Sequence, residues 1–179
     1  MEIKIYLCVI NDDYIDYLHN IDNKVLENKI NRRKYVGILF EIDDKKYYAP
    51  LASPKPKHKN IKNTAPDIVK IDGGKLGVIN LNNMIPVPDS EVNIIDIEGI
   101  ADEKYKNLLR DQAKFISLHK KEIIKKAERL YKIVISGKQP ELNQRCCNYK
   151  LLELKCIEYI KAMEEIMPEI AATKEENME

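Results

Sequence analysis

The hydrophobic pattern of this chain changes its period once, near residue 100. Before that point apolar and polar residues alternate, as they do from Ile3 to Val9 within residues 2–10, and a period of two is typical of a strand with one buried face. From residue 102 onward apolar residues recur every three or four positions, which is typical of amphipathic helices. Strands followed by helices, without β-α-β alternation, predict an α+β fold. We expect a compact domain with a twisted, mostly antiparallel sheet and packed helices, two of them C-terminal.

Turn residues and periodic segments give the expected element boundaries. A short helix is expected at 14–21, and a hairpin at 35–50 turns at Asp43 and Asp44. Further strands are expected near 67–71, at 76–82 and at 91–97, and helices from 102 to about 137 and from 148 to 166. We therefore expect a single domain over residues 1–166, followed by an acidic tail at 167–179. The tail has few large apolar side chains, so we expect it to fray.

Charge is unevenly distributed, although the net charge is only +1. Basic residues without acidic neighbours fill 29–34 and 52–63, basic residues dominate 101–138, and acidic residues dominate 158–179. Three basic segments in one small domain favour a polyanionic partner. The alternative is that these segments are solvent-exposed surfaces without a binding role. No apolar run approaches the roughly 18 residues of a membrane span. The N-terminus has no signal-peptide pattern either, so we expect a cytoplasmic protein.

The cysteines and histidines do not form a metal-binding motif. Cys146 and Cys147 are adjacent, no C-x-x-C pair exists, and the three histidines are scattered. A tetrahedral zinc site favours ligand pairs separated by two to four residues. We therefore expect buried, reduced thiols, with no metal site and no cofactor.

The best candidate site is the loop that follows the strand at 45–50. Residues 49–58 contain one hydroxyl (Ser53), two lysines (Lys55 and Lys57) and an imidazole (His58). RNA cleavage without a metal needs a group that activates the ribose 2′-OH, groups that offset charge on the phosphorane, and a group that protonates the leaving 5′ oxygen. Lys, Arg and Ser can stabilise that charge, and a histidine or a lysine of lowered pKa can move a proton. From these residues alone, an exposed basic loop is an equally valid interpretation.

Six short motifs, taken in order, resemble one known family. They are Tyr14–Leu18 (YIDYL), Tyr35–Ile42 (YVGILFEI), Lys46–Lys55 (KYYAPLASPK), Gly77–Pro86 (GVINLNNMIP), the pair Gln112 and Phe115, and Cys147–Glu153 (CNYKLLE). Together they cover about residues 1–155. They resemble the toxins of type III toxin–antitoxin systems, the ToxN/AbiQ/CptN group of endoribonucleases, with the CptN-like branch nearest.

The resemblance implies a fold akin to the Kid/MazF toxins. It implies metal-independent RNA cleavage that leaves 2′,3′-cyclic phosphate and 5′-hydroxyl ends. It also implies an RNA antitoxin, a repeated pseudoknot, which the toxin processes and which inhibits it within a closed protein–RNA heteromer. The implied role is phage defence by abortive infection or locus maintenance, with cellular or phage RNA as substrate and neither DNA nor a membrane as partner.

The resemblance also assigns roles to individual positions. Ser53 and Lys55 match the family's active-site serine and lysine, Arg33 falls near a family basic residue, and His58 matches a histidine of a relative. Ala52 stands where a relative has threonine. The predicted catalytic set is therefore Ser53, Lys55, Arg33 and His58. The predicted RNA contacts are Arg32, Lys34, Lys57, Lys59, Lys62, Lys121, Lys125 and Asn148, while Tyr47, Tyr48 and Tyr149 are either stacking or core residues. A non-catalytic RNA-binding module is the alternative function.

Overall fold

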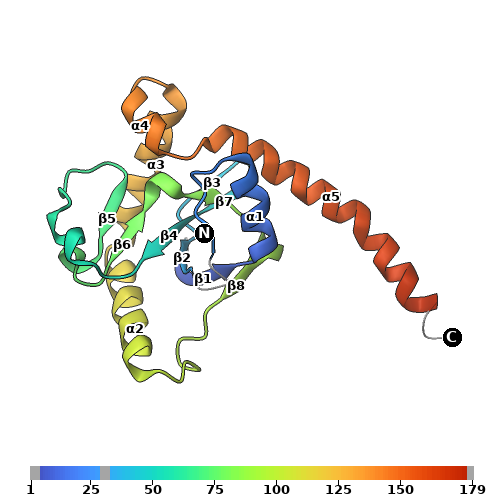
Figure 1. Cartoon of the computed structure of the whole chain (residues 1–179), viewed down its shortest axis with the longest axis horizontal. Coiled ribbons are helices and arrows are strands. Elements are labelled where there is room, and N and C mark those ends of the chain that lie inside the picture. The colour runs from blue at the N-terminus through green and yellow to red at the C-terminus, as the bar shows by residue number, and fades with distance from the viewer. Residues whose placement is uncertain (1–4, 29–32, 177–179) are drawn as a thin grey trace.

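An eight-stranded antiparallel sheet forms the centre of the structure, a computed structural model that describes residues 5–28 and 33–176 (Figure 1). Six strands lie in the order β5-β6-β4-β2-β1-β8, and β3 and β7 pair with β4 outside that row. The strands are β1 (Tyr6–Ile10), β2 (Tyr35–Gly37), β3 (Glu41–Ile42), β4 (Lys45–Ala52), β5 (Ile68–Lys70), β6 (Val78–Asn80), β7 (Ile85–Pro86) and β8 (Val92–Ile94). Strand β4 pairs with four others, so its C-terminal end leaves from the middle of the sheet.

Most of the helical residues follow the strands in the chain. The helices are α1 (Asp12–Ile21), α2 (Glu103–Leu118), α3 (Lys120–Ser136), α4 (Pro140–Arg145) and α5 (Tyr149–Glu176). The first part of α5 contacts β7, α1 and α3, and its later turns project away from the rest of the molecule (Figure 1). This helix continues past residue 166, the expected end of the domain, to Glu176. The α+β prediction is confirmed. No helix in the described part of the chain is long and apolar enough to cross a membrane.

The single long helix expected from 102 to about 137 is wrong: the structure has two helices that meet at His119. The backbone N–H of His119 and its ring Nδ1 both bond to the carbonyl oxygen of Phe115, at 3.0 Å and 2.9 Å. The apolar stripe continues across the break, because Ile116 and Ile123 are both buried. The hydrophobic pattern therefore gives no sign of the break, and a local side-chain bond accompanies it.

The hairpin expected at 35–50 is present but more broken than predicted. Asp43 and Asp44 form its turn with φ of +47° and +62°, as a two-residue hairpin turn requires. The strand expected at 35–42 is interrupted between β2 and β3, and β2 pairs separately with the far half of β4. At this point Gly37 lies directly against the ring of Tyr48, where a Cβ atom would collide.

A buried carboxylate joins the sheet to two helices. Glu153 of α5 accepts hydrogen bonds from the hydroxyls of Tyr47 in β4 and Tyr131 in α3, at 2.8 Å and 2.6 Å, and its other oxygen accepts one from Lys150 at 2.9 Å. Tyr47, Tyr48 and Tyr149 are all at most 1% exposed, so they pack in the core and are not available to stack on RNA. All four cysteines are buried and reduced, as expected.

Candidate active site

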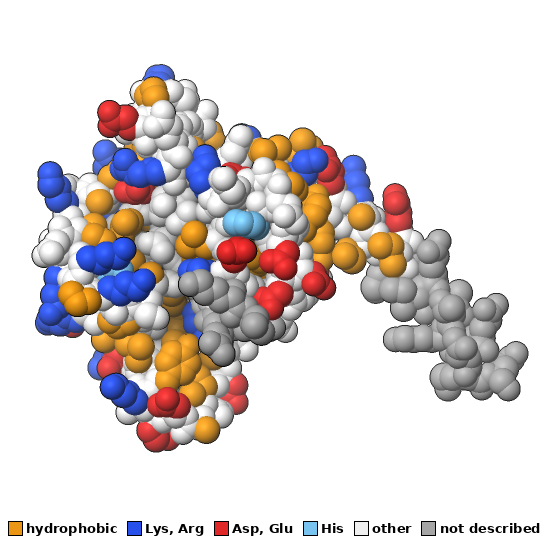
Figure 2. Space-filling model, in the orientation of Figure 1, with side chains coloured by type: hydrophobic (Ala, Val, Ile, Leu, Met, Phe, Trp, Pro, Cys, Tyr) orange, Lys and Arg blue, Asp and Glu red, His pale blue; other side chains and the backbone are white. Residues whose placement is uncertain are grey.

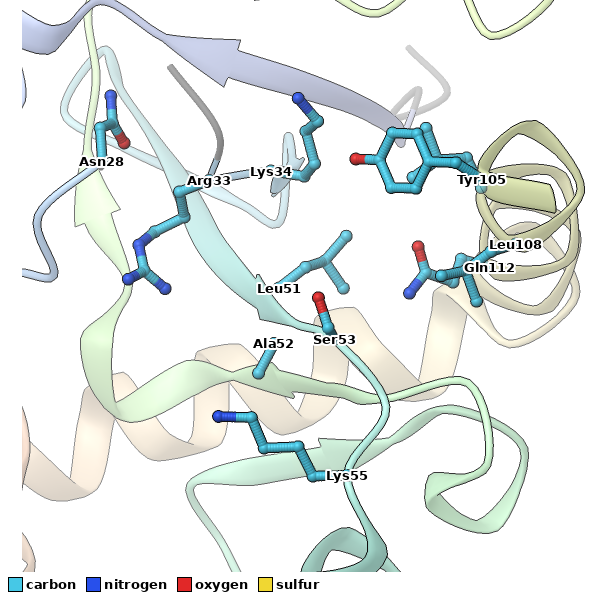
Figure 3. A pocket seen from close by; sticks show the side chains of 11 residues that line it. Asn28, Arg33, Lys34, Leu51, Ala52, Ser53, Lys55, Tyr105, Leu108 and Gln112 are labelled. Carbon is cyan, nitrogen blue, oxygen red and sulfur yellow. The ribbon is translucent and has the colours of Figure 1, made fainter. Parts of the chain in front are cut away.

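A pocket of about 240 Å³ lies at the end of β4, between the sheet and α2 (Figure 3). Three segments meet there: the residues that lead into β2, the end of β4 with its loop, and the N-terminal half of α2. The lining consists of Asn28, Arg33, Lys34, Leu51, Ala52, Ser53, Lys55, Tyr105, Leu108, Leu109 and Gln112. Three of the four predicted catalytic residues therefore share one cavity.

The register between β2 and β4 decides which of these side chains face each other. Tyr35 pairs with Pro50, and the backbone N–H of Leu51 donates to the carbonyl of Lys34 at 2.8 Å, so Lys34 lies opposite Leu51. Because side chains alternate along a strand, Lys34, Leu51 and Ser53 share one face. In Figure 3 the Lys34 side chain extends away from Ser53, the Ser53 hydroxyl points toward Leu51, and the Arg33 guanidinium points away from α2.

Close backbone packing holds the loop after β4 in place. Gly77 has a φ of +104° and lies directly against the carbonyl of Ala52, where any Cβ would collide. Beyond it, Lys55 is extended and its carbonyl accepts the backbone N–H of His58, which begins the 3₁₀ turn η1 (Pro56–Asn60). On the other wall, Gln112 donates to the carbonyl of Leu76 at 2.7 Å and so ties α2 to the segment before β6.

The cations of the pocket differ in environment. Lys34 is half-buried, and burial lowers the pKa of its ammonium. Lys55 is exposed, and its ammonium lies below Ala52 in Figure 3. The Nε of Arg33 donates to the carbonyl of Glu27 at 2.8 Å, so this guanidinium is partly engaged by the backbone. Of the three cations, Lys34 therefore has the environment that favours an unprotonated amine, and the Lys55 ammonium lies on the other side of Ser53 from it in Figure 3.

His58, the fourth predicted catalytic residue, does not line this pocket. This residue belongs to η1 and is 3% exposed, and its Nδ1 has no hydrogen-bond partner among the described residues. Burial lowers its pKa, and the nearby Lys57 and Lys55 lower it further, so the ring is neutral. The structure thus separates His58 from Ser53, although only five positions divide them in the sequence.

The predicted RNA contacts fall into separate groups. Lys57, Lys59 and Lys62 are exposed on the loop between β4 and β5, where basic side chains gather in Figure 2. Lys121 and Lys125 are exposed on α3, away from the pocket lining. Arg32 lies outside the described residues.

Asn148 has a local structural contact instead of a place in the pocket. Its side-chain oxygen accepts the backbone N–H of Leu151, and its own N–H donates to Asp22 at 2.7 Å. Asn148 therefore caps the start of α5, as an asparagine in this position commonly does.

Among the pocket residues that were not predicted to be functional, Tyr105 and Gln112 are the polar ones on α2. Both belong to the apolar stripe of α2, and Gln112 is only 3% exposed. A glutamine inside an otherwise apolar helical stripe is the signal that marks this wall in the sequence. Within the described side chains, no cluster of three or more His, Cys, Asp or Glu is arranged to hold a metal ion.

Comparison with known families is consistent with this geometry. The family model described as "Toxin ToxN, type III toxin-antitoxin system" matches residues 6–158. This chain belongs to the ToxN family. Endoribonuclease ToxN of Pectobacterium atrosepticum is 34% identical over 165 residues, which cover 87% of this chain and 94% of the relative. Endoribonuclease ToxN of Bacillus thuringiensis subsp. kurstaki is 38% identical over 159 residues, which cover 84% and 81%.

Solved structures of the ToxN family match along nearly their whole length. One comes from work on selective toxin inhibition by a non-coding RNA pseudoknot; it is 36% identical, has a TM-score of 0.77, and is matched over 98% of its chain and 87% of this one. Another is AbiQ, a lactococcal anti-phage endoribonuclease, with 27% identity, a TM-score of 0.79, and coverage of 99% of that chain and 88% of this one. The fold around the pocket is therefore the fold of the family.

Proposed function

We propose that this chain is a metal-independent endoribonuclease toxin that cleaves RNA by attack of a ribose 2′-OH on the adjacent phosphate. One observation carries the proposal: the register of β2 and β4 brings Lys34 and Ser53 onto one face of a pocket that Lys55 enters from the opposite side. This arrangement supplies a proton acceptor, a hydroxyl donor and a positively charged proton donor in the walls of one pocket of about 240 Å³.

The roles of the three residues follow from their environments. The Lys34 amine, in its unprotonated form, takes the proton of the 2′-OH as that oxygen attacks phosphorus. The Ser53 hydroxyl and the Lys55 ammonium donate to the non-bridging oxygens, where negative charge grows in the phosphorane. Lys55 then gives a proton to the departing 5′ oxygen, which leaves a 2′,3′-cyclic phosphate and a 5′-hydroxyl. Arg33 binds a flanking phosphate, and His58, buried away from the pocket, has no proton-transfer role in this scheme.

The proposed partner is an RNA antitoxin built of pseudoknot repeats, which the toxin processes and which closes its pocket within a protein–RNA heteromer. Support comes from the family and from the exposed lysines of the loop after β4. We further propose a cytoplasmic toxin that acts in phage defence or locus maintenance on cellular or phage RNA. Its placement in the CptN-like branch is also a proposal, since the relatives described above are named ToxN and AbiQ.

The deciding experiment is cleavage of mixed cellular RNA by the full chain in the presence of EDTA. We expect discrete cuts whose ends are a 2′,3′-cyclic phosphate and a 5′-hydroxyl, because no step above uses a metal. Mapping both ends of the fragments identifies this chemistry. RNA that stays intact while a folded protein binds it tightly would contradict the proposal and favour the non-catalytic RNA-binding module.

The rate of cleavage should rise with pH and level off at the pKa of Lys34. A base must be unprotonated to act, and burial places this pKa below the ordinary lysine value of about 10.4. Lys34→Arg keeps the charge but removes the base, so it should lower the rate by about 10²–10⁴-fold and abolish the rise. The matched control is Lys114→Arg on the exposed side of α2. If Lys34→Arg retains the wild-type rate and profile, Lys34 acts through charge alone.

A further inference from the structure

A second cavity lies farther along α2, outside the site described above. Its volume is about 390 Å³, within the range of roughly 300–1,000 Å³ for small-ligand pockets. It is formed between the edge strand β5, the loop before it, and the junction of α2 with α3. Its lining consists of Lys62, Asn63, Ile68, Val69, Lys70, Phe115, His119, Glu122, Ile123 and Lys126.

Two stacked rings form part of this cavity's wall. Phe115 and His119 stack at 4.0 Å between ring centroids, with an angle of 21° between their planes. The Nδ1 of His119 lies 2.9 Å from the carbonyl of Phe115. A carbonyl can only accept, so Nδ1 carries a proton and donates it to this bond. Stacked rings provide a flat surface, which suits the face of a nucleobase.

Polar and basic groups surround these rings. Asn63 and Glu122 are exposed in the lining and offer an amide and a carboxylate for the edge of a base. Lys62, also exposed, makes no ion pair with any residue in the described part of the chain. Lys126 donates to the carbonyl of Ile68 at 2.6 Å and so fixes the edge strand against α3. An aromatic surface with a free cation beside it matches a nucleotide better than a purely apolar ligand.

The two cavities lie on one face of one helix. Tyr105, Leu108 and Gln112 of α2, which line the first cavity together with Leu109, continue at the same helical spacing into two residues of the second, Phe115 of α2 and His119 at its C-terminal end. At about 1.5 Å of rise per residue, Gln112 and His119 are about 10 Å apart along the axis, the length of a few nucleotides.

A shallow basic groove adjoins the first cavity and approaches the second. It is lined by Pro54, Lys55, Pro56, Lys59, Gly74 and Lys75, so it shares Lys55 with the first cavity. Toward the second, Lys70 donates to the carbonyls of Lys59 and Ile61, at 3.1 Å and 3.0 Å. A single-stranded RNA backbone can therefore follow lysines from one cavity to the other.

We propose that the cavity lined by Phe115 and His119 binds one unpaired nucleobase of the RNA strand being cleaved, a few nucleotides from the cut, and so sets a sequence preference. This inference rests on the proposed endoribonuclease function. The catalytic residues break the bond, and the second cavity selects which bonds are presented to them.

The test uses variants that remove a ring and keep the fold. Phe115→Leu preserves apolar packing, and His119→Asn retains an amide donor for the carbonyl of Phe115. Leu118→Ala, which changes a side chain that is 74% exposed and adjacent to His119, is the matched control.

The measurement maps the cut sites in a mixed RNA pool and compares the frequency of each base at every position around the cut. We expect one position with a clear preference in the wild type and in the control. Either ring variant should weaken that preference by about 5- to 100-fold, the range that one base–aromatic stack supplies.

A second measurement does not depend on cleavage. Single-stranded oligoribonucleotides carrying 2′-O-methyl groups and 2-aminopurine at successive positions report stacking as a loss of fluorescence. The wild type should quench one position, and Phe115→Leu should restore its emission. Unchanged base frequencies or unchanged quenching in both ring variants would overturn this inference. The proposed nuclease activity would not be affected by that result. A wild type that makes no cuts in EDTA but shows ring-dependent quenching would instead overturn the proposed function alone.

Discussion

The Ser53→Ala variant should cleave RNA about 100- to 1,000-fold more slowly than the wild type while folding and binding RNA normally. The loss is the usual effect of removing one preorganised donor from a site where negative charge develops. Ser53 is exposed, and its hydroxyl makes no hydrogen bond with any residue that the structure describes. Its removal should therefore change the free energy of unfolding by less than about 0.5 kcal/mol.

Three measurements separate a catalytic role for Ser53 from a structural one. Single-turnover cleavage gives the rate, fluorescence anisotropy gives RNA affinity, and thermal denaturation gives stability. The matched control is Ser117→Ala, which removes another exposed hydroxyl, on α2 outside the pocket lining. A Ser53→Ala protein that cuts RNA at the wild-type rate would refute the assignment. A variant with reduced RNA affinity and an unchanged rate on bound RNA would make Ser53 a binding residue only.

The order of strands and helices was predictable because the spacing of apolar residues along the chain shows which side chains are buried. A strand buried on one face and an amphipathic helix leave different patterns, and the chain changes from one to the other near residue 100. The break at His119 was not predictable, because both helices bury the same stripe. The short strand β7 was missed because Ile85 and Pro86 are too few residues to show any period.

The sequence was enough to predict the loop that carries the candidate site. It was not enough to predict which residue beside β2 shares the pocket with that loop. Ser53 and Lys55 stand at the end of a recognisable strand, where loops commonly carry functional groups. Whether Arg33 or Lys34 lies on the same face as Ser53 depends on pairing register, and a shift of one residue turns every side chain to the other face. The sequence placed Arg33 in the catalytic set and Lys34 among the RNA contacts. The observed pairing of Tyr35 with Pro50 places Lys34 on the face of Ser53, while the catalytic role of either residue stays a prediction.

Stability should depend most strongly on Glu153, the buried carboxylate that joins β4, α3 and α5. Its side chain is 6% exposed. Glu153→Ala would leave the buried hydroxyls of Tyr47 and Tyr131 without an acceptor, and breaking such a buried network costs about 3–5 kcal/mol. For a chain of this size the melting temperature should fall by roughly 6–20 °C. The control is Glu158→Ala on the same helix. It breaks only the exposed pair with Lys155, so its cost should be below about 1 kcal/mol.

The same carboxylate should make the protein sensitive to acid. Burial alone would raise the pKa of Glu153, but hydrogen bonds from Tyr131, Lys150 and Tyr47 outweigh burial and lower it. A carboxyl whose pKa is lower in the folded state stabilises the fold above its unfolded pKa, about 4.3, and this contribution is lost as pH falls through the folded value. Glu153→Gln does not titrate, so its free energy of unfolding should fall less steeply than that of the wild type below pH 5. Denaturant unfolding at several pH values measures both slopes. Parallel curves would show that the pKa of Glu153 is the same in the folded and unfolded states. A wild type that gains stability relative to Glu153→Gln as pH falls would show that the two tyrosines are bonded to a neutral acid.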